Sequence, residues 1–155
     1  MNENPVKTSA GARRRGLLVI WGAQLFSLVV LFCIAYFLRL ETGIQGNHAV
    51  AWVLGIVGFV IFIASFPVKR KLLAQAAAQR RLDLGTTAYV IAFAFCEATA
   101  LLGIAAYFAT GLSYALHSFI LAAAGMLLHL PARDALEGIE ASGGNASANL
   151  NQTNL

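Results

Sequence analysis

One carboxylate is the clearest candidate for chemistry in this chain. Glu97 lies in the stretch "AFAFCEATALLG" (92–103), near the middle of a long apolar run, and no other acidic residue lies inside such a run. A charged side chain at the centre of a bilayer costs about 2.5 to 3.5 kcal/mol on the insertion scale. Burial therefore favours the protonated carboxyl. A group that is neutral at rest and ionises when it meets a cation or water suits a carrier, so Glu97 is our candidate ion- or proton-binding residue.

The sequence leaves two other roles for Glu97. It can be a protonated side chain that is hydrogen-bonded to a neighbouring helix, or a contact to another subunit. Its possible polar partners in the chain are Gln24, His117 and Ser118. By helical rise, Glu97 lies about 18 Å and His117 about 8 Å below the outer ends of their predicted helices. We therefore expect no direct contact between these two without a helix shift or a bridging water.

The helix that carries Glu97 has two different faces. At 100° per residue, the face with Glu97 is bulky and apolar, while small side chains occupy the opposite face. Small residues allow membrane helices to approach closely, so we expect this helix to pack through the small face. The packing positions that the sequence predicts are Ala92, Cys96, Thr99 and Gly103 in this helix, and Gly55 and Gly58 in the preceding apolar run.

Membrane helices must position these side chains. Of 155 residues, 59% are hydrophobic and only 12% are charged, whereas soluble domains carry about 25% charged residues. Four apolar runs, at 17–38, 49–66, 86–108 and 112–130, are close to the roughly 20 residues that span a bilayer as a helix. Pro67 and Pro131 follow the second and fourth runs and are expected to end those helices. The sequence thus predicts an all-α membrane protein whose four transmembrane helices form two hairpins, joined by a basic loop at 67–85.

The basic residues indicate an orientation. They cluster at the ends of the apolar runs, which favours lipid headgroups over nucleic acid as their partner. Because cytoplasmic loops carry the excess of Lys and Arg, residues 1–16, the central loop and a polar, disordered tail at 132–155 are expected in the cytoplasm. The membrane would be an inner or plasma membrane. The predicted headgroup contacts are Arg13, Arg14, Arg15, Lys69, Arg70, Lys71, Arg80 and Arg81.

Several motifs of enzymes are missing from the sequence. It contains no nucleotide-binding glycine loop, no metal-ligand cluster and no Ser/His/Asp set. We therefore expect no cofactor, no metal and no enzyme activity of the chain on its own. A small subunit of a membrane complex, in contact with lipid and with further copies of itself or other membrane subunits, is the first interpretation. A proton- or cation-translocating protein that uses Glu97 is the alternative.

The stretch "AFAFCEATALLGIAAYF" (92–108) resembles the carboxylate helix of the proteolipid family, which is subunit c of the rotary ATP synthases and ATPases. That helix has a carboxylate, then a small residue, then an apolar–Gly pair, which here would be Glu97, Ala98 and Leu102–Gly103. The resemblance implies that Glu97 is the proton or sodium site of a rotor ring. In that family the carboxylate sits on the second helix of a hairpin, and here it would sit on the first. Four short helices with one membrane glutamate also look like the small multidrug transporters.

Overall fold

The chain forms a bundle of helices. The computed structural model describes residues 5–38, 47–79 and 81–131. Arg80 and the tail at 132–155 lie outside the described residues. The prediction of an all-α fold is confirmed for the part that the structure describes. In chain order its elements are α1 (Pro5–Phe37), α2 (His48–Gln79), α3 (Leu82–Thr110), the 3-10 turn η1 (Ser113–Leu116) and α4 (His117–Leu128).

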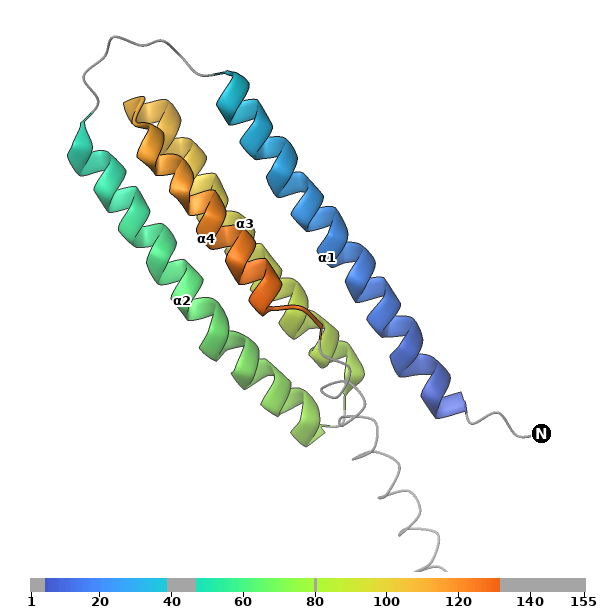
Figure 1. Ribbon diagram of the computed structural model, residues 1–155. Helices are drawn as coiled ribbons and strands as arrows, with labels where there is room; N and C mark the ends of the chain where they lie inside the picture. Colours follow the sequence, from blue (N-terminus) through green and yellow to red (C-terminus); the bar gives the residue numbers. More distant parts are fainter. Residues whose placement is uncertain (1–4, 39–46, 80, 132–155) are drawn as a thin grey trace, which may run out of the picture.

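The four helices lie side by side, with α3 at the centre of the packing. Figure 1 shows α1 on one side of the α3–α4 pair and α2 on the other, with α1 and α3 running in the same direction. Among the described residues, three helical stretches are long and apolar enough to cross a membrane, namely Gly11–Phe37, His48–Gln79 and Leu82–Thr110. These three helices support a membrane location for the protein.

The prediction that the second helix ends at Pro67 is wrong. This proline lies inside α2, which continues to Gln79, and most of the expected basic loop at 67–85 is therefore helical. Pro67 has no N–H to donate to the preceding turn. Burial on both sides of the proline offsets this loss, because Phe62 precedes it and Ala76 follows it, and both are buried.

The fourth apolar run forms a shorter helix than expected. Gly111 ends α3 in the left-handed conformation, with φ 68°, and its N–H donates to Tyr107 O. The chain then makes the 3-10 turn, so α4 begins only at His117. The apolar stretch Ser113–Leu128 is shorter than the three candidate spans. Residues that the sequence assigned to a fourth full span therefore lie in this turn, before α4 begins.

Small residues let α3 approach its neighbours closely. Thr99 Oγ1 donates a hydrogen bond to Gly58 O of α2 at 3.1 Å. A Cβ at Gly103 would coincide with Ser118 Oγ of α4. Ala92 and Cys96 are also fully buried. Gly55 is different, because a Cβ at this position would have no atom within 4 Å. The close contact expected for Gly55 is therefore absent.

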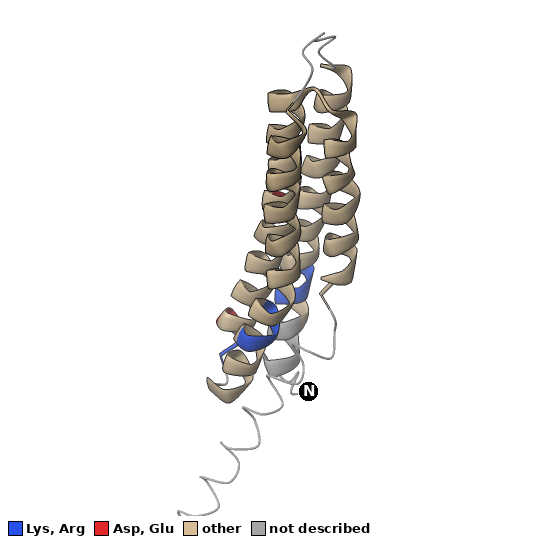
Figure 2. Ribbon diagram, turned by 90° about the vertical axis from the view of Figure 1, so that its left-hand side faces the viewer, with Lys and Arg blue, Asp and Glu red and all other residues tan. Residues whose placement is uncertain are grey.

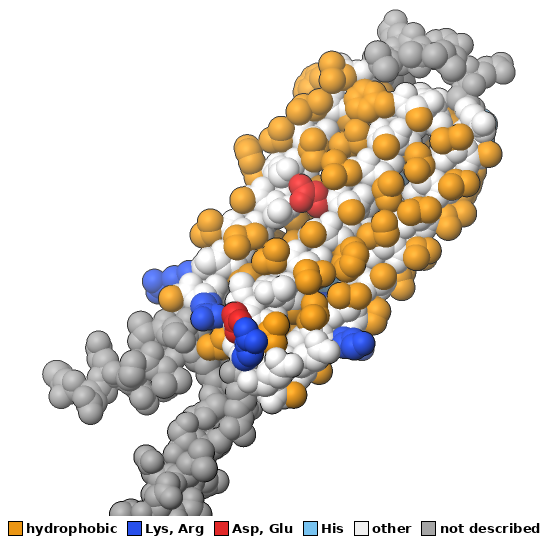
Figure 3. Space-filling view, turned by 180° about the vertical axis from the view of Figure 1, so that it is seen from behind, with side chains coloured by type: hydrophobic (Ala, Val, Ile, Leu, Met, Phe, Trp, Pro, Cys, Tyr) orange, Lys and Arg blue, Asp and Glu red, His pale blue; other side chains and the backbone are white. Residues whose placement is uncertain are grey.

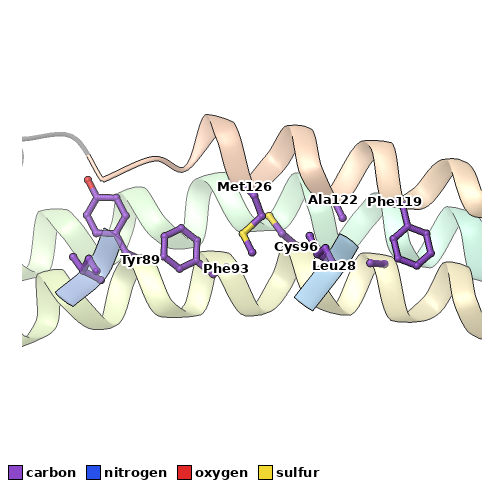
Figure 4. Close-up of a cluster of buried hydrophobic side chains, with 9 residues drawn as sticks. Leu28, Tyr89, Phe93, Cys96, Phe119, Ala122 and Met126 are labelled. Atoms are coloured by element: carbon purple, nitrogen blue, oxygen red, sulfur yellow. The ribbon is translucent and has the colours of Figure 1, made fainter. Parts of the chain in front are cut away.

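The core joins α1, α3 and α4. Figure 4 shows that Met126 of α4 and Cys96 of α3 point toward one another within this cluster. Trp21 of α1 adds a hydrogen bond, since its Nε1 donates to Met126 O at 2.9 Å. These contacts fix the depth of α1 relative to α3 and α4. The buried members of the cluster are Leu17, Leu28, Tyr89, Phe93, Cys96, Ala100, Phe119, Ala122 and Met126.

The surface separates hydrophobic from basic side chains. Figure 2 shows Lys and Arg gathered at one end of the bundle. In Figure 3, hydrophobic side chains cover the rest of the visible face, and an acidic side chain lies among them away from that basic end. This distribution matches a helix bundle whose middle contacts lipid and whose one end contacts headgroups.

Candidate functional site

Glu97 lies on α3 at the border between packed and exposed surface. The Glu97 side chain is half-buried. On the same helix, Phe93 one turn before it is buried in the core, whereas Val90 and Leu101 are exposed. Within the described part of the chain, the Glu97 carboxylate has no hydrogen bond and no ion pair. A carboxyl group in an apolar environment is costly unless something satisfies it. Glu97 is therefore an incomplete polar site on an apolar surface.

Two polar atoms of α1 are buried without a hydrogen-bond partner among the residues that the structure describes, namely Arg14 Nε and Gln24 Oε1. Gln24 belongs to the stripe of α1 that faces the core, at a spacing of three and four residues. The other members of this stripe are Leu17, Trp21, Leu28, Leu31 and Ala35.

The polar groups of Gln24 and Glu97 lie at similar depth along the bundle. Trp21 of α1 contacts Met126, and Cys96 of α3 lies against the neighbouring Gly125. Since α1 and α3 run in the same direction, Gln24 and Glu97 lie within roughly one helical turn of each other along the bundle. The structure thus places the predicted Glu97 and Gln24 at one level on adjacent helices, and each lacks a partner.

The other predicted polar partners lie elsewhere. His117 Nδ1 donates a hydrogen bond to Tyr114 O at 2.7 Å, and Ser118 Oγ donates to Ala115 O at 2.8 Å. Both side chains therefore bond within their own turn near the start of α4. Neither is hydrogen-bonded to Glu97, which agrees with the difference in depth that helical rise gives.

A buried polar cluster at the basic end was not identified from the sequence. His129, which follows α4, is 1% exposed and lies between Ser65 and Lys69 of α2. Its Nε2 is 2.8 Å from Ser65 Oγ, and its Nδ1 is 3.5 Å from Lys69 Nζ. The Lys69 ammonium also lies 4.4 Å from the centre of the Tyr89 ring of α3, a cation–π contact. The cluster therefore ties the end of α4 to α2 and α3.

The donors and acceptors of this cluster have one consistent direction. An ammonium can only donate, so Lys69 Nζ donates to His129 Nδ1. The proton of the neutral imidazole is then on Nε2, which donates to Ser65 Oγ. Ser65 in turn donates to Phe62 O at 2.6 Å. Each hydrogen bond thus fixes the direction of the next.

Lys69, which the sequence predicts as a headgroup contact, is half-buried between α2, α3 and the end of α4. A helix that ended at Pro67 would have left Lys69 in a loop. Because α2 continues, Phe62, Ser65 and Lys69 fall on one helical face, which packs against α3 and α4. Residues spaced three and four apart on both sides of Pro67 are the signal in the sequence that indicates this face. Among the other described residues that the sequence predicts as headgroup contacts, Arg14 is half-buried and Arg13, Arg15, Arg70, Lys71 and Arg81 are exposed.

Replacement of His129 with Leu is expected to lower the free energy of unfolding by about 1 to 2 kcal/mol, because Lys69 and Ser65 each lose a buried hydrogen-bond partner. Unfolding by sodium dodecyl sulfate (SDS) in mild detergent measures this. The double variant with Ser65→Ala should cost less than the sum of the two single changes. Strict additivity of the two changes would show that the 2.8 Å contact contributes nothing.

Comparison with protein-family models, with curated proteins and with solved structures finds no match for this chain. Among the described residues, no group of three or more His, Cys, Asp or Glu side chains is placed to hold a metal ion.

Proposed function

We propose that this chain is a subunit of a membrane complex, and that a partner helix completes the polar group of Glu97. The observation that carries the proposal is the half-buried Glu97 carboxyl, which has no hydrogen bond or ion pair within the described part of the chain. Lipid chains can cover apolar side chains without loss. A carboxyl group needs a hydrogen-bond partner or a cation, which lipid chains do not supply.

The surface around Glu97 suits a partner helix. Leu101, one turn after Glu97 on α3, is a large exposed apolar residue, and so is Val90 two turns before it. The partner is a second copy of this chain or another membrane subunit. A helix that packs on this face of α3 would cover Glu97.

The proposal includes the orientation of the bundle. The basic end is placed in the cytoplasm by the positive-inside rule. The described chain ends near this side, because α4 runs back from the far end and His129 meets Lys69 there. We therefore propose four crossings, with the short stretch Ser113–Leu128 as the fourth and both termini in the cytoplasm.

Photo-crosslinking from a single cysteine tests the partner surface. The exposed Cys33 is replaced with alanine, and the buried Cys96 is retained. A benzophenone maleimide on Leu101→Cys, in the native membrane, should give a protein adduct of defined mass. Adding Glu97→Leu should weaken this association about 3- to 30-fold, the range expected for an interhelical hydrogen bond of 0.6 to 2 kcal/mol. Glu97→Gln, which keeps a hydrogen-bonding group, should retain most of the adduct.

The matched control is Val60→Cys on the outward face of α2. Val60 is 59% exposed and Leu101 48%, and both lie near the level where Gly58 contacts Thr99. The control should give lipid adducts only. An identical pattern from both cysteines would mean that no specific partner covers Glu97. Adduct masses distinguish a second copy from another subunit.

Proton or cation translocation is the alternative, and the same observation supports it. A carboxyl that is half-exposed to the apolar phase and has no partner can exchange a proton or bind a cation. The resemblance of 92–108 to the proteolipid helix points in this direction. In that case Glu97→Gln should abolish ion movement in proteoliposomes while the bundle stays folded.

A further inference from the structure

A cavity lies in the half of the bundle opposite the basic cluster, and Glu97 does not line it. Its volume is about 410 Å³, and it is bounded by the first half of α2, the second half of α3, η1 and the start of α4. Pockets of about 300 to 1,000 Å³ with mostly apolar walls and a few polar groups are typical of small-molecule sites. From its geometry and lining we infer that this cavity binds a long-chain amphiphile with an uncharged hydroxyl head.

Missing side chains create the cavity. Gly55 lines the α2 wall, and nothing lies within 4 Å of the position where its Cβ would be. On the opposite wall, Gly103 and Ala106 of α3 contribute little volume. Lower in the bundle, Phe62 fills the corresponding space and touches the position of a Cβ at Gly125. The cavity is therefore built by small residues above Phe62, and the space suits a hydrocarbon chain.

The lining carries no charge. Among the described residues that border the cavity, none is Lys, Arg, Asp or Glu. A charged head group would lose hydration there without gaining an ion pair, which is unfavourable. The ligand is therefore expected to be neutral.

The polar groups of the lining present acceptors. Ser118 Oγ donates its proton to Ala115 O, and Thr99 Oγ1 donates to backbone oxygens, including Gly58 O. His117 carries its proton on Nδ1, since that atom bonds to the carbonyl of Tyr114, so its Nε2 is an acceptor. Ser118 and His117 thus offer lone pairs and no free proton, whereas Thr99 is buried and Trp52 Nε1 can only donate. The two acceptors match a ligand that donates, such as an alcohol.

The aromatic groups at the mouth fit an amphiphile in the membrane interface. Trp52 and Tyr114 line the cavity with ring centres 6.4 Å apart. The Tyr114 hydroxyl is 3.4 Å from His48 Nδ1. Tyr and Trp are enriched at membrane interfaces, where one end of the ring is apolar and the other is polar. The hydroxyl head would lie at this end and the chain deeper, toward Phe62.

Fluorescence of Trp52 tests the inference. The chain has two tryptophans, so Trp21→Phe leaves Trp52 as the sole emitter. Dibromo-octadecanol is titrated into the purified full-length protein in detergent. Saturable quenching at low mole fraction is expected, distinct from the linear quenching given by random partition into the micelle. Dibromo-octadecanoate at pH 8 should saturate at a concentration about tenfold higher or more.

Gly55→Leu is the decisive variant, because its Cβ would have no atom within 4 Å and the rest of the side chain would take up space in the cavity. It should remove the saturable component and leave the linear one. Gly22→Leu on α1, where a Cβ also meets nothing within 4 Å, should leave binding unchanged. Absence of saturable quenching in the Trp21→Phe parent, or its persistence in Gly55→Leu, would overturn the proposed site. Equal binding of the carboxylate would overturn the hydroxyl selectivity. Neither result bears on Glu97, which does not line the cavity.

Discussion

Gly103→Leu is expected to destabilise the bundle by about 3 kcal/mol, at the upper end of the usual cost of overpacking. Any Cβ at this position would overlap Ser118 Oγ, and it would lie 2.7 Å from Ser118 Cβ and 2.9 Å from Ala115 O. The last two atoms belong to the core-facing part of α4 and η1, so a rotamer change at Ser118 does not remove the clash. The start of α4 would have to move away from α3.

The measurement for Gly103→Leu is SDS-induced unfolding of the purified protein, followed by circular dichroism. Gly22→Leu is the matched control, since it adds the same side chain in a long apolar helix at a position where a Cβ would have no atom within 4 Å. Both variants add the same apolar surface, so the effect of this surface on the free energy of unfolding cancels in the comparison. Equal stability of the two variants would show that α3 and α4 are not packed as closely as the structure describes.

A hydrophobic carbodiimide is expected to label Glu97 in the purified protein, and Glu97→Gln should abolish the labelling completely. The reagent reacts with protonated carboxyl groups that are exposed to an apolar phase. Glu97 is half-exposed and is the only acidic residue within the apolar runs. Because ionisation removes the reactive form, labelling should fall as the pH rises.

The same reaction in the native membrane separates the two proposed functions. A partner helix over Glu97 should protect it there, so that labelling appears only after purification in detergent. Labelling that persists in the membrane and is blocked by sodium would instead favour cation translocation. Failure to label the purified protein at any pH would mean that Glu97 is occluded within its own chain, and the proposed partner site would then be rejected.

The sequence was sufficient for the fold class because the hydropathy of the long runs is unambiguous. It was not sufficient for the helix ends. A proline usually terminates a helix, and only the burial of Phe62 and Ala76 on both sides of Pro67 shows why α2 continues. The start of α4 was likewise misplaced, since the turn that follows Gly111 has the same apolar composition as a helix.

The candidate site was predictable to a similar extent. Glu97 and Gln24 are rare polar residues in apolar runs, so they are visible in the sequence. Their similar depth depends on the contacts of Trp21 of α1 and Gly125 of α4, which set the positions of the helices along the bundle axis. These contacts cannot be read from the composition of the sequence. The His129 cluster was missed because Lys69 was assigned to a loop. Lys69 faces inward because α2 continues as a helix through Pro67, which places Lys69 on the same face as Phe62 and Ser65.

Helix α1 touches the rest of the bundle along one stripe, whereas α3 is covered on several sides. Regions with few buried contacts open at a lower free energy than the whole molecule. Backbone amides of α1 are therefore expected to exchange with deuterium before those of α2 and α3. Because α2 and α3 pack closely against each other, with Thr99 of α3 hydrogen-bonded to Gly58 O of α2, we expect them to open together. The bundle would thus come apart from the α1 side, and α1 would be the last helix to dock during biogenesis.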